Sequence, residues 1–280
     1  IQHDLLLAFI DPYLRVRGKY DVLNDESALI ELQQDMRAVL DERLGHRAGD
    51  SGLQAALARI EASLLEEWAA AYAEQSAEYV DHLAQIWDLP PAPAHLEVAF
   101  GDAPAEQEAE ARFDSLHFGR GSKKTHVRGR IDRIDVGQIG SNPVFNVIDY
   151  KTGTPRRFDL DDVRSGRSLQ LAIYTLAVAR LGLAGSQAVP FQMGYWSIKE
   201  TGFVAGLKGA PLQPLDAAVF DSPHALLEET IPRLAQHIRC GDFPVYSQDP
   251  HCTGYCPYHT VCRVNQVRPL EDKLDKRFPL

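Results

Sequence analysis

GRIDRID (residues 129–135) and VIDYKTG (residues 147–153) are the two runs that decide the fold. They lie in stretches rich in branched apolar residues, 125–136 and 144–150, and both stretches predict strands. Residues 137–143 between them hold two glycines and a proline, which favour a turn. The sequence therefore predicts a hairpin of two strands.

This hairpin would gather two carboxylates and one ammonium group. Alternate side chains of a strand share a face, so Asp149 and Lys151 should project together, and the hairpin would place Asp132 beside them. Carboxylate oxygens bind Mg²⁺, which keeps several waters and accepts a substrate phosphate. Lys151 would then orient an attacking water or stabilise developing negative charge. The alternative is a hairpin with ordinary surface ion pairs, because Asp-x-Lys by itself recurs by chance.

The rest of the chain predicts an α/β protein, with strands and a helix around the hairpin and further helices before and after it. Leu89-Pro90-Pro91-Ala92-Pro93 ends the first helical region, because proline removes a donor and clashes with the preceding turn. Gly182 ends the helix that follows the hairpin. We expect strands at 95–100 and 191–198, and helices at 4–10, 26–44, 53–87 (one helix or two), 169–181 and 225–239, the last with a kink at Pro232.

The length and hydropathy of the chain limit how many domains and membrane-spanning segments it can contain. At 280 residues the chain can form one large core with a helical elaboration, and we expect a helical part at 1–94, an α/β core at 95–200 and a C-terminal part at 201–280. No apolar run approaches the ~20 residues that cross a bilayer, and nothing in the sequence resembles a secretory signal. We expect a cytoplasmic protein without a membrane partner. The chain starts at Ile1, and we expect this start to be either an artificial boundary or a cut from a longer polypeptide.

Charge is distributed unevenly along the chain. The net charge of −10 argues against a protein coated in nucleic acid, and residues 61–110 contain no Lys or Arg. The balance inverts over residues 120–135, a basic run that includes Arg133, and again over residues 156–167. A basic run is often only a solvated face, but these runs flank the carboxylates. The arginines that we expect to contact phosphates are Arg128, Arg130, Arg156, Arg157, Arg164 and Arg167.

Together with QLAIY (residues 170–174), the two runs resemble the nuclease domain of the RecB/AddB family in the PD-(D/E)XK superfamily, which is related to CRISPR-associated RecB-like exonucleases. The resemblance extends from His3 to Cys262. It implies a restriction-endonuclease-like core, which is a central mixed sheet flanked by helices, with an N-terminal helical elaboration and a C-terminal cysteine-rich tail. It also implies a DNA exonuclease that uses Mg²⁺ or Mn²⁺. Such a domain acts on a single-stranded end of linear DNA within a helicase–nuclease system of DNA repair and recombination.

The resemblance assigns roles to residues of the hairpin and the following helix. The two family aspartates that bind metal correspond to Asp132 and Asp149, and the catalytic lysine corresponds to Lys151. The carbonyl of Tyr150 is the expected backbone ligand. Gln170 and Tyr174 lie one helical turn apart on one face and match the Gln-x-x-x-Tyr element that flanks the site and approaches DNA. For Tyr174 the alternative is packing in the core.

Two further positions match the family less specifically. A histidine on an early helix completes the metal shell in the family, and IQHDLL (residues 1–6) makes His3 the candidate. His46, His82 and His95 are the alternatives. Glu97 resembles an acidic position before the first motif and is either a further ligand or a structural partner.

All four cysteines fall between Cys240 and Cys262, which indicates a local site rather than a disulfide framework. CTGYCPYHTVC (residues 252–262) resembles the C-terminal part of an iron–sulfur staple, in which three closely spaced cysteines and one far upstream hold a 4Fe–4S cluster. The first gap has three residues where two are commoner, and no cysteine precedes Cys240. The fourth ligand is then Cys240 or a residue before the chain. The alternatives are Zn²⁺ bound with His251 or His259, or reduced cysteines without metal. The candidate cluster ligands are Cys240, Cys252, Cys256 and Cys262.

Two rival functions stay open at this point. One is a catalytically idle iron–sulfur or DNA-binding module that supports a repair complex. The intact set Asp132, Asp149 and Lys151 argues against it, since an idle module need not keep all three. The other is a site-specific endonuclease, although nothing in the sequence resembles a dedicated base-reading module.

Overall fold

The computed structural model describes residues 52–101, 112–121, 124–151, 153–198, 202–209 and 217–242, together with Gln34, Cys256, Tyr258, Val261 and Cys262. The helix expected at 4–10 lies outside the described residues, as do His3 and His46, and of the helix expected at 26–44 only Gln34 is described, as helical.

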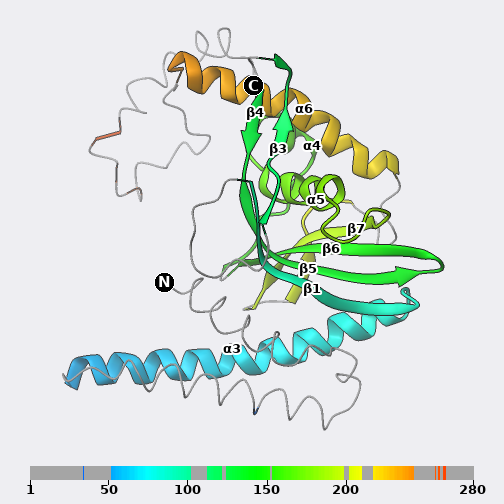
Figure 1. The fold of residues 1–280 in the computed structure, drawn as a ribbon. Coiled ribbons are helices and arrows are strands. Elements are labelled where there is room, and N and C mark those ends of the chain that lie inside the picture. The colour runs from blue at the N-terminus through cyan, green and yellow to red at the C-terminus, as the bar shows by residue number, and fades with distance from the viewer. Residues whose placement is uncertain are drawn as a thin grey trace.

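A six-stranded mixed sheet forms the centre of the molecule (Figure 1), with the strand order β2-β1-β5-β6-β7-β8. The predicted hairpin is present as the antiparallel pair β5 and β6, and β1 pairs antiparallel with the other side of β5. β7 is parallel to β6 and is reached through a helical crossover. The strand bounds are β1 (Leu89–Phe100), β2 (Arg112–Phe113), β5 (Gly129–Ile139), β6 (Asn142–Lys151), β7 (Val189–Ser197) and β8 (Gly202–Ala205).

Helices cover both faces of this sheet (Figure 1), which confirms the expected α/β core. α3 (Gly52–Ala84), one continuous helix, lies on one face. None of the described helices is long and apolar enough to cross a membrane. The other face carries α4 (Leu160–Arg164), α5 (Gln170–Leu181) and α6 (Ala217–Cys240), with a small sheet of β3 (Leu116–Phe118) and β4 (Thr125–Val127) beside them.

The sheet separates two apolar cores. Ile148 and Tyr150 of β6 pack in the core on the α3 side, and Phe145 and Val147 pack in the core on the α5 side. This is the alternation that a strand buried on both faces requires. Full burial of an apolar side chain of this size contributes about 1.5–3 kcal/mol. The two cores therefore fix which residues of β5 and β6 face each helix layer.

α5 is bounded as the sequence predicts. It ends at Gly182, which has a left-handed φ of 68° and whose N–H donates to the carbonyl of Val178. Glycine adopts this conformation without the steric cost of a Cβ. One face of the helix, including Leu171 and Leu176, is buried against the sheet. The crossover therefore places the first residue of α5 beside the end of β6.

Three predicted boundaries differ from the structure. The stretch 125–136 is two strands, because the chain leaves β4 at Arg128 before β5 begins. The prolines of 89–93 belong to β1, where β2 covers only Ala99 and Phe100, so the outer edge of this part has no partner among the described strands. Proline is tolerated on such an edge because it lacks an N–H to donate. Gly137 lies inside β5 rather than in the turn, and a glycine is needed there because the ring of Trp87 leaves no room for a Cβ.

Candidate active site

Asp132 lies where the pairing of β5 with β6 ends. Arg133 and Ile148 are the last paired residues, and beyond them the N–H of Tyr150 donates to Asp132 Oδ2 at 2.9 Å. The carboxylate thus accepts a hydrogen bond that a backbone carbonyl would accept in a continuing ladder. Asp132 is buried as a result. Its position is set by the backbone of the strand that carries Asp149 and Lys151.

β1 turns at this level of the sheet, so that its side chains change face. Leu96 packs in the α3-side core and Val98 in the α5-side core, although both would share a face in a regular strand. Glu97 between them has a φ of 49° and is the one non-glycine residue with positive φ in the described part of the chain. Leu96 pairs with Arg133, so Glu97 lies at the level of Asp132. Strained backbone of this kind concentrates at functional sites.

Asp149 and Lys151 share a face of β6, as expected. The ammonium group of Lys151 forms an ion pair with Asp149 Oδ2, and Gln170 Nε2 donates to Asp149 Oδ1 at 2.7 Å. Gln170 is the first residue of α5, so the helix supplies this donor from a fixed position. The Asp149 side chain is 2% exposed, whereas that of Lys151 keeps 35% of its surface in solvent. Lys151 is therefore the member of the pair that a ligand can reach.

Tyr174 joins the site through its hydroxyl group and the core through its ring. The hydroxyl oxygen lies 3.3 Å from Gln170 Nε2, and the ring meets that of Phe100 edge to face at 6.2 Å between centroids. A Cβ at Gly129 would lie 2.9 Å from the Phe100 ring and 3.1 Å from the Tyr174 ring. This close approach explains the glycine that opens the GRIDRID run.

The two carboxylates are placed in an electrostatically unfavourable way. Burial raises the pKa of Asp132 to about 7, and the nearby charge of Asp149 adds to the rise, followed by that of Glu97. The Tyr150 N–H and Lys151 act in the opposite direction. Two buried carboxylates this close favour a proton or a cation between them. Oxygen donors are the ligands that Mg²⁺ and Mn²⁺ prefer, so the pair fits a hard divalent ion.

The described residues supply only part of a metal shell. No group of three or more His, Cys, Asp or Glu side chains is placed to hold a metal ion within the described ranges. A Mg²⁺ site needs few protein ligands, since the ion keeps several waters. Among the alternative histidines, His95 is hydrogen-bonded to the carbonyl of Leu183 at 2.9 Å and His82 is exposed near the end of α3. His3 stays a prediction.

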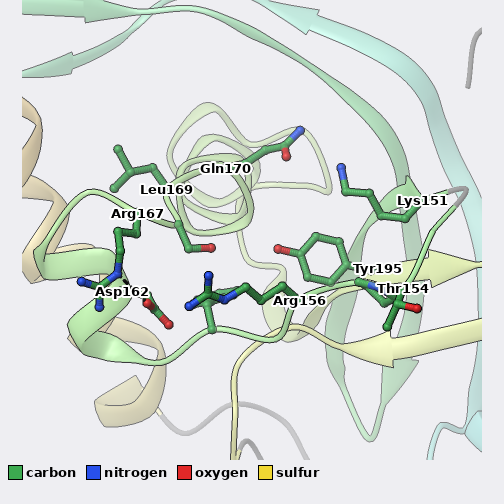
Figure 2. Close-up of a pocket in the computed structure, with 11 residues that line it drawn as sticks. Lys151, Thr154, Arg156, Asp162, Arg167, Leu169, Gln170 and Tyr195 are labelled. Atoms are coloured by element: carbon green, nitrogen blue, oxygen red, sulfur yellow. Dashed lines mark hydrogen bonds and ion pairs between the residues drawn. The ribbon is translucent and has the colours of Figure 1, made fainter. Parts of the chain in front are cut away.

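The six arginines expected to contact phosphates do not form one group. Arg156 and Arg167 line a pocket together with Lys151 (Figure 2). Arg156 extends from the loop after β6, and Arg167 precedes α5. These two arginines are the members of the set that the structure brings next to the candidate catalytic lysine.

The other four arginines lie at separate places. Arg130 Nη1 is 3.5 Å from Glu97 Oε2, and Arg128 is exposed between β4 and β5. Arg157 donates to a backbone carbonyl at 3.5 Å, and Arg164 pairs with a neighbouring aspartate of α4. Their contact with phosphates stays a prediction.

Tyr195 is a residue of the site region that sequence reasoning did not single out. It lies on β7 directly opposite Asp149, and the ammonium group of Lys151 is 5.7 Å from its ring centroid. Burial raises the pKa of its hydroxyl group, which is hydrogen-bonded to the side chain of Ser168. The sequence predicts a strand here. The register between two parallel strands joined by a helix has no local sequence pattern, so the position of Tyr195 opposite Asp149 could not be predicted.

The cysteines are described only in part. Cys240 ends α6 with an exposed thiol whose sulfur accepts a hydrogen bond from Gln236 Nε2 at 3.0 Å. Cys256 is half-buried and Cys262 is exposed, and neither forms a disulfide with another described cysteine. Cys252 lies outside the described residues. The cluster stays a prediction.

Comparison with known proteins gives a match over nearly the whole chain. The sequence-family model of the PD-(D/E)XK nuclease superfamily matches residues 2–263 of this chain. Curated proteins named as a subunit of an ATP-dependent helicase/deoxyribonuclease are similar in sequence. The protein of Desulforudis audaxviator is 37% identical over a stretch that covers 35% of this chain and 8% of that relative. The protein of Natranaerobius thermophilus is 34% identical over a stretch that covers 38% of this chain and 9% of that relative. That of Carboxydothermus hydrogenoformans is 30% identical over 48% and 12%. The matched part thus spans about a tenth of these relatives.

Proposed function

The chain belongs to the PD-(D/E)XK nuclease superfamily, and from this premise we propose that it is a metal-dependent deoxyribonuclease that degrades linear DNA from an end. The observation that carries the proposal is the convergence of three groups at one end of the β5–β6 pair. Asp132 is hydrogen-bonded to the backbone beside Asp149, and Asp149 is ion-paired with Lys151. Two carboxylates can hold a divalent ion that activates a water, and one ammonium group can stabilise negative charge on a phosphodiester, so this set suits its hydrolysis.

The ion would be Mg²⁺ or Mn²⁺. Asp132 and Asp149 would hold it, with the carbonyl of Tyr150 and, from the family resemblance, His3. A divalent ion at this place offsets negative charge on phosphoryl oxygens and makes water more acidic.

The chain's own side chains would position the reacting groups. The ammonium group of Lys151 is held between Asp149 and the ring of Tyr195, and an ammonium group so placed stabilises negative charge on a phosphate or orients a water. Gln170 fixes one oxygen of Asp149 from the start of α5. Such bonds matter because a misplacement of about 1 Å at a reacting group can cost roughly 10²-fold in rate.

The relatives suggest the setting of the reaction. Their name joins a helicase with a deoxyribonuclease, and the matched part of each is a small fraction of its length. We propose that this chain works with a helicase, fused or separate, in DNA repair and recombination. The helicase would deliver a single-stranded end, and the arginines around the site would contact its phosphates. Such contacts supply affinity rather than sequence recognition.

We also propose that Cys240, Cys252, Cys256 and Cys262 bind a 4Fe–4S cluster, with Zn²⁺ as the alternative metal. Support comes from the exposed thiols of Cys240 and Cys262 and from the tight spacing of the last three cysteines. Four thiolates suffice for either metal. The cluster would attach the C-terminal tail to the core. Iron and zinc analysis of anaerobically purified protein, with its absorbance spectrum, distinguishes the two metals from no metal.

Degradation of linear single-stranded DNA tests the nuclease function. With Mg²⁺ present, we expect Lys151→Ala to lower the rate by about 10²–10⁴-fold, the usual range for loss of an acid–base or charge-stabilising group. Lys208→Ala is the matched control, because it removes an exposed lysine that pairs with Asp159 on the nearby loop. It should digest at the wild-type rate.

Two outcomes would contradict the proposal. Equal digestion by wild type and Lys151→Ala would show that the activity comes from elsewhere. Digestion of closed circular DNA as fast as of linear DNA would show an endonuclease in place of an exonuclease.

A further inference from the structure

The pocket beside Lys151 has a volume of about 340 Å³. This is near the lower end of the range for small-ligand sites, ~300–1,000 Å³. The pocket lies between the loop after β6 and the segment that leads into α5, with Gln170 on its rim (Figure 2). The space suits one nucleotide unit of a single strand.

The charges that line this pocket favour an anion. Lys151, Arg156 and Arg167 are cationic, and Asp162 is the anionic residue among the lining side chains. Arg167 Nε is 2.9 Å from Asp162 Oδ1, which holds that guanidinium group in place. Arg156 is exposed and makes no hydrogen bond or ion pair with another described residue. A guanidinium group carries five N–H donors, and the exposure of Arg156 lets a ligand reach it.

Tyr195 connects the pocket with the candidate active site. Its backbone is opposite Asp149, its ring lies under Lys151, and its hydroxyl group points into the pocket (Figure 2). Arg156 lies on the other side of this ring from Lys151 (Figure 2). An anion bound by Arg156 would therefore lie next to, and separate from, a phosphate held at the two carboxylates.

We propose that this pocket binds the phosphate group adjacent to the scissile one, and that Arg156 is the residue that donates to it. The inference rests on the proposed nuclease function, because it assigns pocket and carboxylates to one DNA strand. The planar guanidinium group matches two phosphate oxygens at once, which a lysine cannot do. An internal phosphodiester and a phosphate at a strand end share this chemistry, so the experiment must separate them.

Binding without cleavage tests the pocket directly. In EDTA no divalent ion is available for cleavage, and fluorescence anisotropy then reports the affinity for a short oligothymidylate over a series of salt concentrations. Three probes are compared: one without a terminal phosphate, one with a 5′-phosphate and one with a 3′-phosphate. The variants are Arg156→Ala, Arg156→Lys and Lys208→Ala as the control outside the pocket. Circular dichroism confirms that each variant is folded.

We expect Arg156→Ala to weaken binding by about tenfold or more, the usual loss for a hydrogen-bonded charge pair. The slope of log affinity against log salt should become shallower by about 0.7, the value for one phosphate contact on a single strand. Arg156→Lys should keep the wild-type slope but bind more weakly, since it keeps the charge and loses the paired donors. Equal loss on all three probes identifies an internal phosphodiester, and loss confined to one phosphorylated probe identifies a terminal phosphate.

Wild-type affinity and slope in Arg156→Ala would overturn the proposal. An equal loss of affinity in Lys208→Ala would also overturn it, because removal of any nearby positive charge would then weaken DNA binding to the same extent. The two proposals can fail separately. Arg156-dependent binding by a protein that cuts no DNA rejects the nuclease function and keeps the pocket, whereas Lys151-dependent cutting with binding that ignores Arg156 rejects the pocket alone.

Discussion

The two faces of β5 and β6 treat buried charge in opposite ways. On the face toward α3, Arg133 and Asp135 are both fully buried and form a two-bond ion pair, with Nε–Oδ1 at 2.6 Å and Nη2–Oδ2 at 2.7 Å. On the face toward α5, Asp132 and Asp149 are buried with one lysine between them and the solvent. The face toward α3 balances its charges in a buried ion pair, whereas the face toward α5 brings two buried carboxylates close to a lysine that is partly exposed.

Hydrogen bonds complete the balanced face. Arg133 Nη1 donates to the hydroxyl oxygen of Tyr72 at 2.9 Å and to that of Tyr150 at 3.3 Å. The hydroxyl of Tyr79 donates to Asp135 Oδ2 at 3.1 Å. Tyr72 and Tyr79 belong to α3, so the network ties that helix to the strands that carry the candidate catalytic groups. A buried network of ion pairs and hydrogen bonds makes the local structure rigid.

The comparison shows that the two faces of one pair of strands have different roles: one anchors the strands, and the other carries the candidate catalytic groups. Tyr150 is anchored toward α3 by its hydroxyl group, while its N–H orients Asp132 and its neighbours Asp149 and Lys151 point toward α5. The network on the α3 side thereby holds the candidate catalytic residues on the α5 side in register. Substitutions in the network on the α3 side should lower the stability of the protein. Substitutions of the candidate catalytic residues on the α5 side should lower ligand binding and activity.

The largest effect on stability is expected from Arg133→Met. The change leaves Asp135 as a buried charge without its partner, which typically costs about 3–5 kcal/mol. Urea unfolding followed by circular dichroism measures this loss. The double variant Arg133→Met with Asp135→Leu should recover much of it, because an apolar pair of similar volume replaces a buried ion pair at little cost.

A smaller effect on stability is expected on the α5 side when the pH is lowered. His224 of α6 is 7% exposed, and burial, with Arg180 as a second cause, lowers its pKa from 6.5 to about 4. Arg180 itself pairs with Glu228 at 2.6 Å. The unfolded chain therefore binds one more proton than the folded chain between these two pH values, so stability falls as the pH is lowered from about 6.5 to about 4, by up to about 3 kcal/mol.

His224→Gln removes this titration and should flatten the pH dependence of the free energy of unfolding over the same window. Urea unfolding of both proteins at several pH values provides the measurement. Parallel curves for wild type and variant would show that His224 is protonated as easily in the folded chain as in the unfolded chain.

The contrast between the two faces also shows what the sequence could reveal. The hairpin, α5 and the juxtaposition of Asp149 with Lys151 follow from local spacing, and the structure confirms them. The basic run of residues 120–135 forms one continuous stretch in the sequence, yet its member Arg133 is fully buried. Strand alternation places it on the opposite face from Asp132. It donates to the hydroxyl of Tyr72 and lies over the ring of Tyr79, and both tyrosines belong to a helix more than 50 residues earlier. Such long-range pairings leave no local pattern.

The turn of β1 at Glu97 was likewise not predictable. A positive φ at a glutamate has no sequence signature, because glutamate does not favour that conformation. The edge position of the prolines in 89–93 depends on which strands pair with β1, and that is a property of the assembled sheet. Sequence spacing identified the candidate catalytic side chains, whereas the strain and the anchoring network that position them emerge only from the packed structure.

Binding of Mn²⁺ tests the central claim most directly. Calorimetric titration of wild type, Asp132→Asn and Arg156→Ala with Mn²⁺ compares loss of a proposed ligand with loss of a neighbouring pocket residue. We predict that wild type and Arg156→Ala bind the ion with equal affinity and that Asp132→Asn loses most of the binding while remaining folded. Undiminished Mn²⁺ binding by Asp132→Asn would contradict a metal site between the two carboxylates.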